Sequence, residues 1–290
     1  MDTERNRLTL KVIQLEELNI LLKVRDFFEA HGIRYFLCGW TLLGAVRHGG
    51  FIPWDDDIDI FVPREDFERL RDFVKTSRPD LGSVIFCIPG DDGYIYPFIK
   101  AVNTSILVDY GKPMDNLLWI DIFPLDRYPD NKIMHRFYLN LILNLERALA
   151  MGTFTDEHMR QRGYYDSLSK RIKMCIMRGI YKILGGYRNV SRIIDRLGRS
   201  VDRKYRSSEH FGDGAWPNGM HDYYHESWIF PTIKMKFEGH DFNVPKNYDA
   251  FLRHFYGDYM TLPPEDKRQT HYLTAYRIES SKRSRGYPLL

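Results

Sequence analysis

Residues 39–60 read Gly-Trp-Thr-Leu-Leu-Gly-Ala-Val-Arg-His-Gly-Gly-Phe-Ile-Pro-Trp-Asp-Asp-Asp-Ile-Asp-Ile, and the rest of the fold is organised around them. At their end, Asp57, Asp59 and Phe61 alternate with aliphatic residues. Successive side chains of a strand point to opposite faces, so this alternation predicts a strand with both carboxylates on one face. Two such carboxylates repel each other unless a cation lies between them, and Mg²⁺ prefers oxygen ligands that it shares with substrate phosphates. The pattern predicts a magnesium site; the structural alternative is an acidic strand end that only meets solvent.

The segment before the acidic residues predicts an anion site. Residues 33–38 are apolar and of strand length, and Gly39 ends them. The residues that follow are good helix formers, so the first N–H groups of a helix would lie beside a glycine turn, where they and the helix dipole favour phosphate. We therefore expect Gly39, Thr41 and Arg47 to contact a substrate phosphate. A glycine turn followed by an Asp-x-Asp strand is the layout of a nucleotidyltransferase site.

A third carboxylate is expected from another strand, residues 117–123. Asp121 lies there among apolar residues, and a buried carboxylate without a partner is costly. The simplest partner is the metal site, where Asp121 would bind the ion or take the proton of the attacking hydroxyl. The alternative is an internal partner such as Arg47 or Lys100. For Asp126 we expect a turn or capping role.

Several of these segments resemble the signature of the LicD family, which contains bacterial phosphocholine transferases and has the fukutin-related ribitol-phosphate transferases as relatives. The central match is Thr41–His48 followed by Phe51–Ile60. Further matching positions lie downstream, and they are residues 119–126, residues 256–260, Pro263, Arg268 and His271.

The resemblance implies an α/β fold with a nucleotidyltransferase-like core, that is, a mixed twisted sheet flanked by helices and carrying a helical insertion. It implies transfer of a phospho-alcohol from a CDP-activated donor to a hydroxyl of a cell-surface glycan (teichoic acid or lipopolysaccharide) or of its lipid-linked precursor, with release of CMP. Phosphocholine is expected first, then ribitol or glycerol phosphate, with Mg²⁺ or Mn²⁺ as cofactor. The residues implied in catalysis and metal binding are Asp57, Asp59 and Asp121, with Asp55 and Asp56 beside them or as extra ligands. The residues implied in substrate binding are Gly39, Thr41, Arg47, Lys100, Arg268 and His271.

Two other functions stay open. The chain could transfer a nucleoside monophosphate from a nucleoside triphosphate to a small hydroxyl compound, which would release pyrophosphate in place of CMP. It could also be an inactive module that binds nucleotide-activated donors, although the intact acidic cluster speaks against this.

The role of Lys100 has an alternative as well. Lys100 could be a strand lysine that only meets solvent.

Composition and length fit one large domain or two small ones. We expect a catalytic core over residues 1–130, a basic helical insertion over 131–210, and a C-terminal segment over 211–290 that packs back on the core. No apolar run approaches the roughly 18 residues of a membrane span, and the N-terminus has no signal-peptide pattern. The three cysteines are scattered, so we expect a cytoplasmic protein, peripheral on the inner membrane face if it contacts lipid.

Positive charge is concentrated in one segment. Residues 159–206 carry 14 Lys and Arg but 3 Asp and Glu, whereas the whole chain has a net charge of only +3. Isoleucines recur among these cations, which predicts two basic amphipathic helices broken at residues 185–186. Such helices favour an anionic membrane surface; the alternative is a solvated helical cover. No nucleic-acid-binding module accompanies the charges, so we expect no nucleic-acid partner.

Other patterns predict local structure. We expect an amphipathic helix that ends at about Ala30 and is capped by Gly32. Its inward-facing stripe should consist of Leu8, Val12, Leu15, Leu18 and Leu22. We expect a hairpin of residues 96–102 and 105–108, and a polar loop over 153–161. Further expected elements are helices over 65–75, 131–151 and 247–256, a strand over 84–88, a hairpin of 233–237 with 242–244, and a loop over 211–224 in which Trp216 or Tyr223 stacks on a base or sugar.

Overall fold

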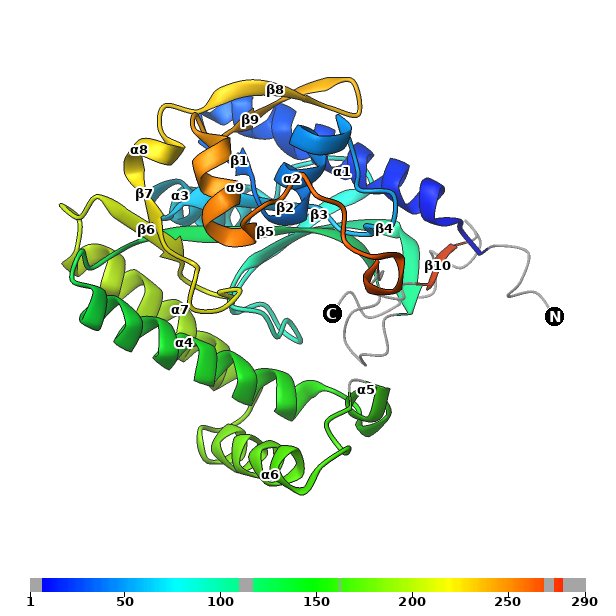
Figure 1. Cartoon of the computed structure of the whole chain (residues 1–290). Helices are drawn as coiled ribbons and strands as arrows, with labels where there is room; N and C mark the ends of the chain where they lie inside the picture. Colours follow the sequence, from blue (N-terminus) through cyan, green and yellow to red (C-terminus); the bar gives the residue numbers. More distant parts are fainter. Residues whose placement is uncertain (1–6, 110–116, 162, 269–273, 279–290) are drawn as a thin grey trace.

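The computed structural model describes residues 7–109, 117–161, 163–268 and 274–278. Within these residues eight strands form one curled mixed sheet, whose main path runs β1-β2-β5-β4-β10 (Figure 1). Two further strands, β8 and β9, form a separate hairpin. The expected α/β fold, a mixed sheet flanked by helices, is confirmed. The strands are β1 (Phe36–Leu37), β2 (Asp59–Pro63), β3 (Val84–Cys87), β4 (Ile99–Asp109), β5 (Leu117–Tyr128), β6 (His210–Asp213), β7 (Tyr224–His225), β8 (Ile233–Phe237), β9 (His240–Val244) and β10 (Thr274–Arg277).

The centre of the sheet fixes the position of the acidic residues. β2 and β5 are parallel, and their register places Asp59 directly opposite Asp121. β4 runs antiparallel to β5 on the other side and places Lys100 opposite Asp121. Three charged side chains from segments far apart in the sequence therefore lie in one row across the sheet.

The helices lie on both sides of this sheet. α7 lies against β5, α4 packs on α7, and α6 packs on α4, so three helical layers stack on one side (Figure 1). No helix of the described residues is long and apolar enough to cross a bilayer. The helices are α1 (Leu10–His31), α2 (Gly39–His48), α3 (Arg64–Ser77), α4 (Lys132–Thr153), α5 (Asp156–Gln161), α6 (Leu168–Ile183), α7 (Tyr187–Lys204), α8 (Glu226–Ile229), α9 (Tyr248–Tyr256) and the 3₁₀ turn η1 (Glu265–Lys267).

The first helix agrees with its predicted end and in part with its predicted face. Gly32 adopts the left-handed conformation (φ +62°) and caps α1, because a residue without a Cβ adopts it at no steric cost. Ile13, Leu21 and Phe28 lie in the core, whereas Leu15 is 46% exposed. Of the predicted stripe, Leu18 is buried, and Leu8 and Leu22 pack half-buried against the core.

The predicted hairpin across residues 103–104 is wrong. β4 continues through this point as one strand, with a shift in its pairing to β5 between Asn103 and Leu107. The N–H and the hydroxyl of Thr104 both donate to the carbonyl of Ser83, beside the edge strand β3. Pairing with strands on both sides outweighs the local turn preference of an Asn-Thr pair, and a bulge forms in place of a turn.

The remaining predictions differ mainly at their ends. The strand expected over residues 33–38 pairs only at Phe36–Leu37, and the strand expected over 117–123 continues to Tyr128. The stretch expected as a loop over 153–161 contains the short helix α5. The helices expected over 65–75, 131–151 and 247–256, the strand expected over 84–88, the break at 185–186 and the β8–β9 hairpin are confirmed within a few residues.

Candidate active site

A cavity of about 410 Å³ opens at the row of charged residues. Its walls come from the start of α2, from β2, β4 and β5, from α9, and from the loops before β4 and after β6. The residues that line it are Gly39, Trp40, Asp56, Asp57, Asp59, Tyr96, Phe98, Lys100, Trp119, Asp121, Phe123, Trp216, Asn218, Phe255 and Tyr256.

The alternation of β5 separates core from cavity as expected. Leu118, Ile120 and Ile122 are completely buried on one face. Asp121, on the opposite face, lines the cavity. The pattern of a lone carboxylate among apolar residues thus located a site-facing side chain correctly.

Carboxylates dominate the charge of the cavity. Partial burial raises the pKa of Asp59, and the neighbouring Asp57 and Asp121 raise it further, while Lys100 acts in the opposite direction. Burial also raises the pKa of Asp55, again with contributions from Asp57 and Asp59. Negative charges held this close favour a bound cation, which would lower their mutual repulsion.

Lys100 is the internal partner of Asp121. Its Nζ lies 3.2 Å from Asp121 Oδ1. The ammonium also lies over aromatic rings, 3.9 Å from the ring centroid of Trp119 and 4.5 Å from that of Tyr96. Lys100 is 4% exposed, so it is a fixed part of the cavity wall and not a solvated strand residue.

The turn at Gly39 is shaped by the neighbouring carboxylate. Gly39 has φ +57°, and a Cβ at this position would lie 2.8 Å from Asp59 Oδ2. The Thr41 hydroxyl is buried and accepts a hydrogen bond from the N–H of Asp59 at 2.9 Å. Gly39 therefore lets the chain pass close to Asp59, and Thr41 anchors the start of β2 and is not one of the lining residues.

Two predicted substrate-binding arginines lie together, but not in the cavity lining. Arg47, at the end of α2, donates a hydrogen bond to the carbonyl of Tyr259 at 2.8 Å. Burial lowers the pKa of Arg47, and the positive charge of the nearby Arg268 lowers it further. The guanidinium of Arg268 lies 5.0 Å from the ring centroid of Trp54. The third residue of this prediction, His271, lies outside the described residues.

An aromatic wall faces the carboxylates. Trp216 packs edge-on against Tyr96 and Phe98, with ring centroids 5.7 Å apart in both pairs. Tyr223, the alternative stacking residue, lies against His210 at 4.3 Å and is not among the lining residues. Of the two predicted candidates, Trp216 is the one placed to stack on a ligand in the cavity.

Sequence reasoning missed two polar residues of α1 beneath the site. Gln14 is buried, and its Nε2 donates to the carbonyl of Asp55 at 2.8 Å, which holds the acidic loop. Glu17 is also buried, and burial together with Asp57 and the other site carboxylates raises its pKa. Gln14 and Glu17 lie three residues apart within an apolar helix stripe, and this pattern could have indicated that both are buried.

The expected turn or capping role of Asp126 is wrong. Asp126 is completely buried and accepts two hydrogen bonds from Arg64, at 2.5 and 2.7 Å. Arg64 also contacts Asp195 of α7 at 3.3 Å. A Cβ on Gly214 would lie 1.6 Å from Asp126 Oδ2, so the chain comes this close only with glycine there. Asp126 ties β5 to α3 and α7.

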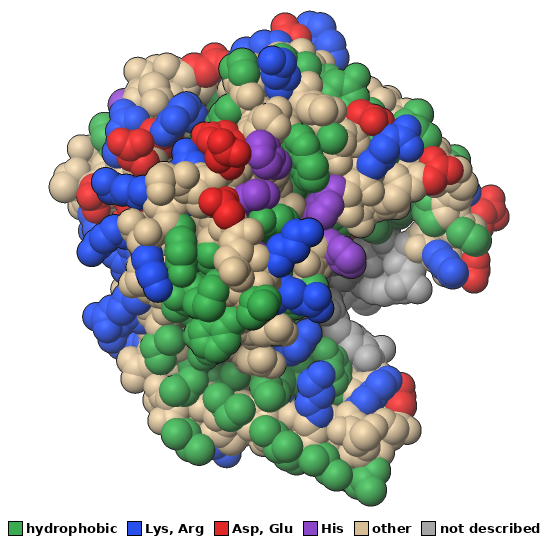
Figure 2. Space-filling model, turned by 60° about the vertical axis from the view of Figure 1, so that its left-hand side comes forward, with side chains coloured by type: hydrophobic (Ala, Val, Ile, Leu, Met, Phe, Trp, Pro, Cys, Tyr) green, Lys and Arg blue, Asp and Glu red, His purple; other side chains and the backbone are tan. Residues whose placement is uncertain are grey.

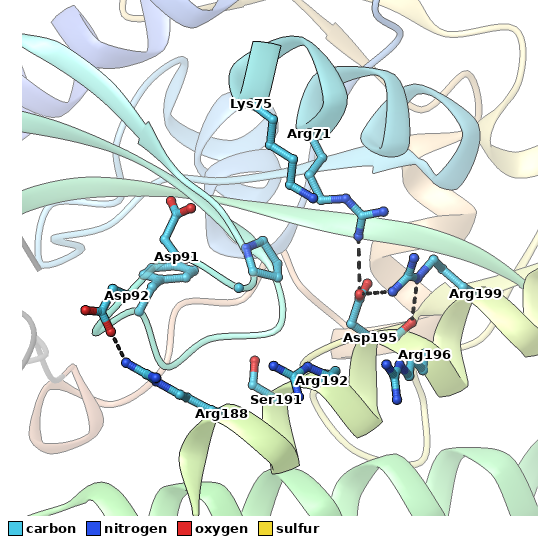
Figure 3. Close-up of a pocket in the computed structure, with 13 residues that line it drawn as sticks. Arg71, Lys75, Asp91, Asp92, Arg188, Ser191, Arg192, Asp195, Arg196 and Arg199 are labelled. Atoms are coloured by element: carbon cyan, nitrogen blue, oxygen red, sulfur yellow. Dashed lines mark hydrogen bonds and ion pairs between the residues drawn. The ribbon is translucent and has the colours of Figure 1, made fainter. Parts of the chain in front are cut away.

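A second pocket, of about 420 Å³, lies between α3, α7 and the loop before β4 (Figure 3). Asp195 binds Arg71 at 3.2 Å and Arg199 at 2.5 Å, and Arg188 pairs with Asp92. Four arginines of α7, namely Arg188, Arg192, Arg196 and Arg199, therefore line this pocket. The basic segment consequently has two different faces, since α6 lies away from this pocket beyond α4 (Figure 1).

Comparison with known proteins agrees with this geometry. Residues 32–141, which contain α2 and the three strands of the site (β2, β4 and β5), match the family model described as LicD/FKTN/FKRP, nucleotidyltransferase domain. Fold and site thus define a nucleotidyltransferase-type domain. By this domain the chain is similar to the LicD family over residues 32–141.

Two relatives show how far the similarity extends. The chain is 28% identical over 273 residues to the lipopolysaccharide cholinephosphotransferase LicD of Haemophilus influenzae. This match covers 92% of this chain and 97% of that protein. The chain is 38% identical over 110 residues to the ribitol 5-phosphate transferase FKRP of Homo sapiens, and the same holds for that of Mus musculus. The FKRP match covers 37% of this chain and 19% of the relative, so only a small part of FKRP is shared. The relatives with named activities are transferases.

Proposed function

We propose that this chain transfers a phospho-alcohol from a CDP-activated donor to a hydroxyl of a glycan or of its lipid-linked precursor, and that CMP is released. The observation that carries the proposal is the row formed by Asp59, Asp121 and Lys100 across three adjacent strands at a cavity with an aromatic wall. The similarity to a cholinephosphotransferase over nearly the whole chain supports phosphocholine as the first candidate, followed by ribitol or glycerol phosphate.

The donor set fits a divalent ion that shares its ligands with the substrate. Within the described residues, no group of three or more His, Cys, Asp or Glu side chains is placed to hold a metal ion, so the expected set of Asp57, Asp59 and Asp121 does not come together as one metal centre. Mg²⁺ needs only one or two protein carboxylates when substrate phosphates and water complete its shell. Asp57 and Asp59 would hold Mg²⁺, or Mn²⁺, and the raised pKa of Asp59 in its crowded surroundings fits a site where a cation offsets carboxylate repulsion. When bound, the ion would neutralise negative charge on the donor pyrophosphate.

The protein's own residues would then position the reactants. Asp121 takes the proton of the acceptor hydroxyl on a carboxylate oxygen, while Lys100 keeps that carboxylate oriented. A bond forms between the acceptor oxygen and the phosphorus that carries the alcohol. The bond from that phosphorus to the bridging oxygen breaks, and CMP leaves with its electron pair. Gly39 and the start of α2 would face the donor phosphates.

The aromatic wall would recognise the two ends of the donor. Base-to-aromatic stacking on Trp216 would hold the cytosine. A quaternary ammonium such as choline favours aromatic faces by cation–π attraction, and Tyr96 and Trp119 already hold one cation, the Lys100 ammonium, in this way.

Product analysis tests the proposal. Purified protein is incubated with Mg²⁺ and with CDP-choline, CDP-ribitol, CDP-glycerol, CTP or ATP, together with a glycan extract as acceptor. Phospho-alcohol transfer releases CMP from one CDP-alcohol only when acceptor is present. Pyrophosphate from CTP or ATP, with no CMP from any CDP-alcohol, would contradict the proposal and establish nucleotidyl transfer in its place.

A further inference from the structure

Helix α6 presents a row of apolar side chains to the outside. Met174 is the one buried residue of α6, all of whose residues the structure describes. Isoleucines and a leucine follow each other at spacings of three and four residues, which places them along one side of the helix. These exposed side chains are Leu168 (72%), Ile172 (52%), Ile176 (53%), Ile180 (36%) and Ile183 (85%).

The first half of α4 repeats this feature. Ile133 is 79% exposed and Phe137 58% exposed, with Leu141 one further turn along. Leu149, further along the same helix, is buried. Figure 2 shows hydrophobic side chains gathered over the lower part of the molecule, where Figure 1 places α4 and α6, with Lys and Arg beside them. Apolar area concentrated in this way marks a binding surface.

Positive charge accompanies the apolar row. α6 carries five Lys and Arg and no Asp or Glu, and Arg171, Lys173 and Lys182 are exposed beside the isoleucines. Four of the five arginines of α7, in contrast, line the pocket around Asp195. Among the described residues, the exposed apolar row with cations beside it lies on α6 and continues to the start of α4.

We propose that the exposed apolar side chains of α6 and of the first half of α4 insert into an anionic phospholipid bilayer, while the neighbouring lysines and arginines bind its headgroups. An amphipathic helix with a cationic rim lies in the plane of a membrane with its apolar side chains below the headgroups. A second copy of the chain is the less suitable occupant, because lysine is depleted in protein interfaces. This proposal does not depend on the transfer reaction.

Vesicle co-sedimentation with the full chain tests the surface. The vesicles are phosphatidylcholine alone, or phosphatidylcholine with about one-third phosphatidylglycerol, each at low and high salt. The test variant is I172N/I176N, whose positions are about half exposed, so that folding is retained. The matched control is L15N, a residue 46% exposed on α1. Thermal unfolding of each variant verifies that it is folded.

We expect binding to the anionic vesicles that weakens with salt, and a loss of about tenfold in affinity for I172N/I176N but not for L15N. The triple variant R171Q/K173Q/K182Q should lose the preference for anionic vesicles over neutral ones. Equal binding by wild type and I172N/I176N, or no binding to anionic vesicles, would overturn the proposal. A wild-type dimer in sedimentation that I172N/I176N dissociates, without vesicle binding, would overturn it in favour of a second copy.

Discussion

Lys100 and Asp121 face each other on adjacent antiparallel strands, with 3.2 Å between Lys100 Nζ and Asp121 Oδ1. Their side chains are only 6% and 14% exposed, and the ring of Trp119 covers the ammonium. This arrangement fixes one positive charge in the wall of a cavity that is otherwise acidic. The pair offsets part of the repulsion among the carboxylates and holds Asp121 in one orientation.

Replacing Lys100 by Met should destabilise the protein by about 3 kcal/mol, because a shielded carboxylate loses its partner. Activity should fall at least about a hundredfold, since a fixed charge at the reacting centre is removed. Urea unfolding and CMP release measure the two effects. The double variant K100M/D121N should recover much of the stability but none of the activity; simple addition of the two single-variant costs would show that the pair is not coupled.

Replacing Gly39 by Ala should abolish most activity at a modest cost in stability of about 1–2 kcal/mol, the cost of a left-handed conformation for a residue with a Cβ. The added Cβ would lie 2.8 Å from Asp59 Oδ2 and would displace that carboxylate. Gly49 is the matched control, because it has φ +70° and no heavy atom within 4 Å of an added Cβ. G49A should lose similar stability and keep its activity; equal activity of the two variants would rule out the close approach to Asp59 as the reason.

Replacing Trp216 by Ala should weaken the binding of the CDP-activated donor by roughly tenfold, the typical effect of losing one base-to-aromatic stack. Calorimetric titration measures the dissociation constant. Y223A is the control, since Tyr223 stacks on His210 and not on the cavity. If Y223A weakens donor binding as much as W216A does, the assignment of Trp216 as the stacking residue is incorrect.

His135 should make the stability of the protein pH-dependent. It is 4% exposed, neither ring nitrogen has a hydrogen-bond partner among the described residues, and burial lowers its pKa to about 4. The unfolded chain binds the proton near pH 6.5, so this contribution to stability is complete above that pH and is lost as pH falls toward 4. At pH 5 the wild type should have lost about 2 kcal/mol relative to its value at pH 7.5 from this group.

The variant H135F lacks the titrating group. The difference in the free energy of unfolding between H135F and wild type should therefore change by about 2 kcal/mol between pH 7.5 and pH 5. Urea unfolding of both proteins at pH 5 and pH 7.5 measures this. A difference that stays constant with pH would mean that the imidazole becomes protonated in the folded state without penalty.

The sequence was sufficient to predict which carboxylates face the cavity. Asp59 and Asp121 each interrupt an apolar alternation, and period-two patterns assign faces reliably when the other face is buried. For the partner of Asp121 it left the metal site, Arg47 and Lys100 open, and the structure shows Lys100. Lys100 was expected beside a turn, whereas β4 continues past it because strands pair on both of its sides.

Contacts between distant segments were the least predictable part. Trp216 reaches the cavity from a loop after β6, and the pairing of β6 with β5 that places this loop leaves no local pattern in the sequence. For Asp126, on β5, the sequence predicts a turn because prolines flank its segment, yet its partner Arg64 lies at the start of α3.

In the proposed reaction Asp57 and Asp59 bind the donor together with Mg²⁺, and the transfer depends on this role. Its most direct test is calorimetric titration of CDP-choline, CDP-ribitol and CDP-glycerol into wild type, D57N and D59N, with and without Mg²⁺. We predict that wild type binds one CDP-alcohol more tightly than CTP only when Mg²⁺ is present, and that both variants lose this Mg²⁺ dependence while their melting temperatures stay nearly unchanged. Donor binding that is equally tight without Mg²⁺, or unaltered in D57N and D59N, would contradict this role of the two carboxylates.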